Sequence, residues 1–278
     1  MKTTTGSASS RALEHFQTWL YSKNMSDNTI CVYRCAVEQF YTLYPQLTQK
    51  NMQLYKIHLL ENYKPQTVNL RIRALNCFAE YRQASVSPIP MIKIQQKTYL
   101  DKIISQADYE YLKRRLLEEE EYTYYYIVRL IAATGVRVSE LVTFQVVDVY
   151  RGHKDIYSKG NKMRRVYIPT CLQRELLSWL SSLGRSSGFL FLNRFQAPVS
   201  PSGIRCQLKN FAYRFHLDPE IMYPHSFRHR FAKNFLAKFN DISLLADLMG
   251  HESIETTRIY LTRSSDEQRA LIDKVVTW

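Results

Sequence analysis

Two segments near the middle of the chain carry charged side chains at spacings that could serve chemistry. The run ATGVRVSEL places Arg137 and Glu140 three residues apart, on one face of a helix. Further along, SKGNKMRRVYIP presents Lys159 at the turn-rich tip of a predicted hairpin. Each signal is weak by itself, because a helical arginine is usually solvated or ion-paired and a hairpin lysine is usually exposed.

Two segments nearer the C-terminus add histidines, a second arginine and a tyrosine. HSFRH places His225 and Arg228 on one side of a helical turn, and GHESIETTRIY places His251 nine residues before Tyr260. The chain has 20 tyrosines, most of which serve packing, so Tyr260 alone indicates little.

A zinc site is an alternative interpretation of the histidines. The i, i+4 spacing of His225 and His229 matches the metal pair of a zinc protease helix. That motif has a glutamate as general base directly after the first histidine, and here Ser226 takes the position. A hydrolytic zinc site therefore loses its best support, and we predict no metal ligands.

Hydrophobic periodicity predicts the elements that must position these residues. Helical patterns run through residues 11–24, 26–44, 48–61 and 65–79, which predicts a small helical bundle as a first domain over 1–85. Two prolines within three positions, Pro88 and Pro90, disfavour helix and indicate an interdomain linker over 86–97.

Residues 98–278 form the predicted second domain. It alternates helices with three strand-like segments, at 146–150, 154–157 and 164–168, and is mostly helical beyond Pro169, ending in a short helix over 266–276. The predicted fold class is therefore mainly α with a small β-sheet (α+β).

Composition and charge limit the classes of function. The 38 Lys and Arg residues against 25 Asp and Glu give a formal net charge of +13, of which +6 lies in residues 1–94 and +7 in 95–278. An excess in both halves favours a polyanion that both domains touch, although solvated faces are the alternative. The sequence shows no apolar run near the ~18 residues of a membrane span and no signal-peptide core. Five cysteines without a CxxC pair favour a reducing compartment, so secreted and disulfide-framed classes are excluded.

Taken together, these residues resemble the tyrosine recombinases, also called the phage integrase family. The catalytic set of that family runs Arg, Lys, His-x-x-Arg, His or Trp, and Tyr in chain order. Six residues of this chain match it at intervals of 22, 66, 3, 23 and 9: Arg137, Lys159, His225, Arg228, His251 and Tyr260.

The resemblance covers roughly residues 11–270, because SDNTICVYRCAVEQF and PQTVNLRIRALNCFAEY look like core-binding helices of the family's first domain. It departs from the family pattern at Phe227, where leucine is commoner, and at Ser158, where glycine often precedes the lysine. The interval from Arg137 to Lys159 is also short, so Lys162 is the second candidate for the lysine.

The resemblance implies site-specific cleavage and rejoining of duplex DNA through a 3′-phosphotyrosyl link, without ATP, metal or other cofactor. Two guanidiniums, of Arg137 and Arg228, can fork onto the non-bridging phosphate oxygens and stabilise the extra negative charge. Tyr260 is then the nucleophile, with His225 assisting removal of its proton. The expected general acid for the 5′-oxygen is Lys159, the expected further hydrogen-bond donor is His251, and Glu140 is expected to orient the site.

Recombinases of this family join two short inverted-repeat sites through four protomers and a Holliday junction. The expected partners are therefore double-stranded DNA and further copies of the chain in a tetramer, with an accessory protein as another candidate and no membrane. We expect a cytoplasmic, nucleoid-associated protein. About ten residues precede the first predicted helix, so we expect no arm-binding domain, which favours Xer-like, invertase-like or transposon-encoded members. Candidate DNA contacts are Arg34, Asn69, Arg73, Asn76, Lys162 and Arg164.

Two other classes of function are alternatives. A type IB topoisomerase-like enzyme would use similar chemistry to relax supercoils without exchanging partners. A catalytically silent DNA-binding protein would bind without forming a covalent adduct, although all six residues are present.

Overall fold

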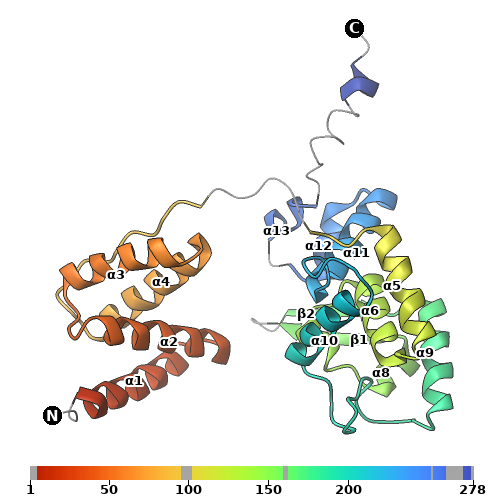
Figure 1. Cartoon of the computed structure of the whole chain (residues 1–278), viewed down its shortest axis with the longest axis horizontal. Helices are drawn as coiled ribbons and strands as arrows, with labels where there is room; N and C mark the ends of the chain where they lie inside the picture. Colours follow the sequence, from red (N-terminus) through yellow and green to blue (C-terminus); the bar gives the residue numbers. More distant parts are fainter. Residues whose placement is uncertain (1–4, 95–101, 159–161, 252, 261–271, 277–278) are drawn as a thin grey trace. The chain divides into compact units, whose positions relative to one another are not determined.

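A computed structural model divides the chain into two compact units, Met1–Gln96 and Lys97–Trp278 (Figure 1). The structure describes residues 5–94, 102–158, 162–251, 253–260 and 272–276. Within these ranges every helix is too short or too polar to span a lipid bilayer. The predicted fold class, mainly α with a small β-sheet, is confirmed, whereas most of the helix predicted over 266–276 lies outside the described residues.

The first unit is a four-helix bundle, as the periodicity predicted. Side chains of Ser26 and Thr48 cap the second and third helices, and Pro65 stands at the start of the fourth, where its missing N–H costs nothing. Large aromatic side chains, including Phe16, Phe40 and Phe78, are buried where the helices meet. The helices are α1 (Thr5–Ser22), α2 (Asp27–Leu43), α3 (Gln49–Asn62) and α4 (Pro65–Tyr81).

Two asparagines of α4 hold the proline-containing segment that follows the bundle. The side chain of Asn76 donates to the carbonyl of Ile89 and accepts from its N–H, both at 2.9 Å. Asn69 pairs with the backbone of Ile92 in the same way, at 2.9 and 2.8 Å. Ile89 itself is 4% exposed, so residues 86–94 of the predicted linker pack on the first unit. The amides of Asn69 and Asn76 therefore bind the chain itself, and their expected role in DNA contact stays a prediction.

The second unit surrounds helix α6 (Tyr122–Thr134), which is apolar on most faces and packs along α11 (Pro224–Lys238). Strands β1 (His153–Ser158) and β2 (Lys162–Tyr167) form an antiparallel hairpin, with Ile156 opposite Arg164. The other helices are α5 (Gln106–Glu118), α7 (Val138–Leu141), α8 (Val146–Arg151), α9 (Thr170–Ser182), α10 (Pro201–Arg214), α12 (Ile242–Met249) and α13 (Glu255–Arg258).

The strand predicted at 146–150 is wrong, because these residues form helix α8. The Asp148 carboxylate accepts a 2.8 Å hydrogen bond from the N–H of Gln145 and so caps the helix N-terminus. Val146 and Val149, three residues apart, are both buried, as one helix face requires. The composition of a short apolar run is compatible with a strand or a helix, and here the hydrogen bond of Asp148 at the N-terminus favours the helix.

Candidate active site

The carbonyl ends of two helices hold the two arginines. Gly135 caps the C-terminus of α6 and Gly250 caps that of α12, both in the left-handed conformation with φ of 64° and 63°. The Gly135 carbonyl accepts a hydrogen bond from the guanidinium of Arg228, and the Gly250 carbonyl accepts one from Arg137 at 2.8 Å. The negative ends of both helix dipoles therefore face cations that are distant in sequence.

Gly135 also allows a close approach that no larger residue permits. A Cβ atom there would collide with the ring of Phe231 on α11, in addition to the strain of its positive φ. The glycine therefore lets the end of α6 lie directly against α11, beside Arg228.

Glu140 joins Arg137 to the β-hairpin. Its carboxylate accepts from the Arg137 guanidinium at 3.0 Å and from the Arg137 backbone N–H at 2.8 Å, while Arg164 of β2 donates at 2.5 Å. Burial raises the pKa of Glu140, but the charge of Arg164 and the donors of Arg137 outweigh it and leave the pKa below its usual value. Arg164, an expected DNA contact, is thus a nearly buried support of Arg137, with a second bond to the Leu248 carbonyl at 2.7 Å.

Arg228 is the most buried cation of the site, with 3% of its surface exposed. It donates to the carbonyl of Met249 at 2.8 Å and to Nε2 of His251 at 3.0 Å. Burial, with the nearby charge of Arg137, lowers the pKa of Arg228 to about 10, so it stays charged at neutral pH. Among the described residues no carboxylate pairs with it, which leaves the cation available for an anion.

His251 is held in one tautomer. Because arginine only donates, Nε2 of His251 must accept, and its Nδ1–H then donates to the Thr257 hydroxyl at 2.8 Å. Burial and the charge of Arg228 lower the pKa of His251 to about 4, so the ring is neutral.

Tyr260 lies between two histidine rings, and only 7% of it is exposed. Its hydroxyl lies 2.7 Å from Nδ1 of His229, and its ring is nearly parallel to that of His251, with centroids 6.5 Å apart. Burial raises the pKa of Tyr260 to about 12, because it outweighs the opposing charges of Arg228 and Arg137. Figure 1 shows α11, which carries His229, together with α12 and α13, which directly precede His251 and Tyr260, in one part of the second unit.

His225 lies one helical turn before His229, with ring centroids 6.3 Å apart. Burial, followed by the charges of Arg228 and Arg137, lowers the pKa of His225. The contact with the Tyr260 hydroxyl that we expected of His225 is made by His229, which the sequence suggested only as a zinc ligand. Its i+4 spacing from His225 was the signal for a shared face. In the described residues no three His, Cys, Asp or Glu side chains are placed to hold a metal.

Comparison with known proteins decides the family. Residues 97–267 match the model described as the phage integrase family. The chain belongs to the phage integrase family. A tyrosine recombinase XerC of Herpetosiphon aurantiacus is 29% identical over 280 residues, covering 91% of each chain. The XerA recombinase of Pyrococcus furiosus is 25% identical, covering 95% of this chain and 94% of its own. This phage integrase family member is a site-specific tyrosine recombinase that cleaves and rejoins DNA.

Solved structures share the fold. A lambda integrase tetramer bound to a Holliday junction matches with a TM-score of 0.72 and 16% identity, over 92% of this chain and 78% of that one. The XerH recombinase in a post-cleavage complex with palindromic difH substrate matches with a TM-score of 0.70 and 18% identity, over 92% of this chain and 81% of that one.

The remaining predicted residues of the recombinase belong to the first unit or fall outside the described residues. Lys159 falls outside the described residues, as does the side chain of Lys162 at the start of β2. Arg34 makes an exposed ion pair with Glu38 at 2.8 Å, and Arg73 lies against the sulfur of Met91 on the first unit. These four residues stay predictions as lysine or DNA-contact positions.

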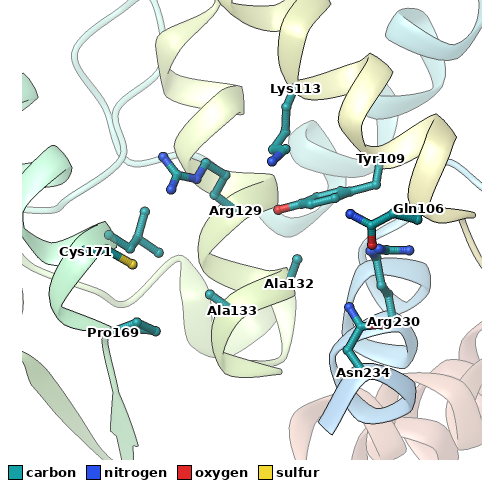
Figure 2. Close-up of a pocket in the computed structure, with 11 residues that line it drawn as sticks. Gln106, Tyr109, Lys113, Arg129, Ala132, Ala133, Pro169, Cys171, Arg230 and Asn234 are labelled. Atoms are coloured by element: carbon teal, nitrogen blue, oxygen red, sulfur yellow. The ribbon is translucent and has the colours of Figure 1, made fainter. Parts of the chain in front are cut away.

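A cavity of about 210 Å³ lies between α5, α6, α9 and α11, and none of the six predicted catalytic residues lines it (Figure 2). Its cations have protein partners: Arg129 pairs with Glu175 on α9, and Lys113 pairs with Glu110 at 2.7 Å. Arg230 lies over the ring of Tyr109, 4.9 Å from its centroid. The Arg129–Glu175 pair joins α6 to α9, and the Arg230–Tyr109 contact joins α11 to α5.

Proposed function

We propose that Tyr260 is the nucleophile of this recombinase and that Arg137 and Arg228 bind the scissile phosphate. The single observation that carries the proposal is the position of the Tyr260 hydroxyl, hydrogen-bonded to one histidine on α11 and next to the Arg228–His251 pair. Two guanidiniums fixed by helix carbonyls are already in place before the reaction, which is when cations stabilise a transition state most effectively.

Strand cleavage follows from these positions. The Tyr260 oxygen attacks phosphorus in line with the 5′-oxygen, the two arginines stabilise the added negative charge, and the 5′-hydroxyl leaves. His251, which we expected to donate a further hydrogen bond, accepts one from Arg228 and helps to hold that guanidinium in place. The product is a 3′-phosphotyrosyl link, and attack by another 5′-hydroxyl reverses the step. Protonation of the leaving oxygen is assigned to Lys159, with Lys162 as the second candidate.

The proposed substrate is duplex DNA with two short inverted-repeat sites, joined by four copies of the chain through a Holliday junction. The net charge of +6 in residues 1–94 and +7 in 95–278 supports contact of both units with a polyanion. The DNA and Holliday-junction complexes of the lambda integrase and XerH neighbours also support this proposal. The place of action is then the nucleoid, and an accessory protein is a further candidate partner.

A two-part assay tests the proposed function. The first part incubates the chain with a nicked suicide duplex whose site is selected from random-sequence DNA by binding to the Tyr260→Phe variant; a covalent adduct is expected. The second uses plasmids with one or two copies of that site, and recombinant products are expected only with two. Relaxation independent of the site would indicate a topoisomerase, and binding without an adduct would indicate a silent DNA-binding protein.

A further inference from the structure

The hydroxyl of Tyr260 has one hydrogen-bond partner among the described residues, Nδ1 of His229, at 2.7 Å. The Tyr260 ring packs with Phe231 and Phe235 of α11 and with the buried residues of α12, and only 7% of Tyr260 is exposed. His229 is partly buried beside it. The two ring centroids are 5.4 Å apart. A short contact between two largely enclosed side chains fixes where the phenolic proton points.

The protonation states define the direction of this hydrogen bond. Burial, followed by the charges of His225 and Arg228, lowers the pKa of His229 to about 4, so the ring is neutral at pH 7. Tyr260, whose pKa is raised to about 12, keeps its proton. The phenol therefore donates, Nδ1 accepts, and the ring proton of His229 is on Nε2. A lone pair of a neutral imidazole is thus aimed at the proton that must leave before the tyrosine can attack.

We infer that His229, and not His225, is the catalytic residue that accepts the proton of Tyr260 during strand cleavage. The inference rests on the proposed role of Tyr260 as nucleophile. The O–H bond of Tyr260 breaks and its proton binds the lone pair of Nδ1. The phenolic oxygen forms a bond to phosphorus as the bond from phosphorus to the 5′-oxygen breaks. That oxygen takes a proton from the general acid, and the reverse attack returns each proton.

The arrival of the scissile phosphate supplies the driving force for this transfer. In the free protein, burial and then the charges of Arg228 and Arg137 disfavour a cation on His225 and His251. At His229 burial is the largest cause, followed by the charges of His225 and Arg228. A phosphate bound to these arginines offsets that repulsion and makes Nδ1 of His229 more basic. Proton transfer is therefore coupled to a correctly bound substrate, and the free enzyme keeps a protonated, buried tyrosine.

Two substitutions separate proton acceptance from hydrogen bonding. His229→Asn keeps an oxygen near the position of Nδ1 but is not basic, and His229→Ala removes both functions. Single-turnover adduct formation on the selected suicide duplex is expected to slow by ~10²–10⁴-fold in both variants, the usual contribution of a general base. Added imidazole is expected to restore the rate of His229→Ala and not that of Tyr260→Phe. Equal affinity of all variants for the duplex serves as the check on folding.

The pH dependence of the cleavage rate, and a change of leaving group, show whether the His229 substitutions affect the proton of Tyr260 or the proton given to the 5′-oxygen. The wild-type rate is expected to fall at acid pH as His229 becomes protonated, and the rate of His229→Asn is expected to rise tenfold per pH unit toward the pKa of Tyr260. A duplex with a 5′-bridging sulfur needs no general acid, so the His229→Asn defect is expected to persist on it. Recovery on that duplex would overturn the inference, because the missing proton would then belong to the leaving group.

Three outcomes contradict the role of His229 while leaving the proposed function intact. They are a wild-type rate for His229→Asn, imidazole rescue of His225→Ala in place of His229→Ala, and an Nδ1–H tautomer of His229 in nitrogen NMR of the wild-type protein at pH 7. Absence of any adduct from the wild-type protein, or an adduct on another tyrosine, would instead contradict the proposed function.

Discussion

At the scale of single residues, Glu140 holds two arginines of the site in place. Its carboxylate, 14% exposed, pairs with both Arg137 and Arg164 and reduces the repulsion between these two neighbouring cations. Removing one partner of a buried ion pair leaves an uncompensated charge, which costs roughly 3–5 kcal/mol. The positions of Arg137 and of the β-hairpin thus depend on one acidic side chain.

The Glu140→Gln variant tests this dependence. We expect it to lower the free energy of unfolding by about 3 kcal/mol and to slow adduct formation, because the Arg137 guanidinium loses its anchor. The control is Glu118→Gln, which removes a half-exposed helix pair with Arg115 and is expected to change stability by no more than about 0.5 kcal/mol. Urea unfolding of both variants gives the comparison, and equal stabilities would contradict this role of Glu140.

At the scale of elements, α11 and the turn after α12 carry two partly buried histidines, His229 and His251, that are neutral because desolvation and neighbouring positive charges lower their pKa. The pKa of His229 is about 4 in the folded chain, against 6.5 for a free histidine, so the folded state binds fewer protons between these values. The free energy of unfolding is therefore not reduced by His229 above pH 6.5. It decreases as the pH falls from 6.5 toward 4, because the unfolded chain then binds a proton that the folded chain does not.

Unfolding measured between pH 7 and pH 5 tests this coupling. The free energy of unfolding should decrease by about 2 kcal/mol from His229 alone, since protons bind the unfolded chain first. In His229→Asn that part of the slope should disappear. A slope unchanged by the substitution would mean that His229 is already protonated, or accessible to water, in the folded state.

The elements also explain which predictions from sequence succeeded. The bundle of α1 to α4 was predictable because apolar residues recur at helical spacing and Ser26, Thr48 and Pro65 mark helix starts. Helix α8 was missed because a run of valines has strand composition, and only the Asp148 cap and the shared burial of Val146 and Val149 distinguish it.

The site was predictable in its residue types but not in its contacts. The order of residue types along the chain identified Arg137, Arg228, His251 and Tyr260 as candidates, and in the structure they lie in one cluster. The partner of the Tyr260 hydroxyl depends on how α13 packs on α11 and α12, which no spacing encodes. In the same way, the polar face of α4 had the composition of a DNA contact. Its asparagines, however, form hydrogen bonds with the backbone of the segment that follows the bundle, at Ile89 and Ile92.

At the scale of the whole molecule, both units carry a positive net charge, +6 and +7 for residues 1–94 and 95–278. Binding to duplex DNA should therefore release many counterions. With on the order of 6–10 phosphate contacts, the affinity of Tyr260→Phe for its selected site is expected to fall ~10³–10⁵-fold between 50 and 200 mM salt. A nearly flat salt dependence would show that only one unit, or neither, contacts the phosphate backbone of the DNA.

The most direct test of the account is to identify the residue that becomes covalently linked to DNA. The wild-type chain is trapped on a nicked suicide duplex, digested with protease and nuclease, and the modified peptide is sequenced by mass spectrometry. We predict a 3′-phosphotyrosyl adduct on Tyr260 and none in Tyr260→Phe, which should still bind the duplex with unchanged affinity. An adduct on Tyr223 or Tyr213, or one that persists in Tyr260→Phe, would contradict it.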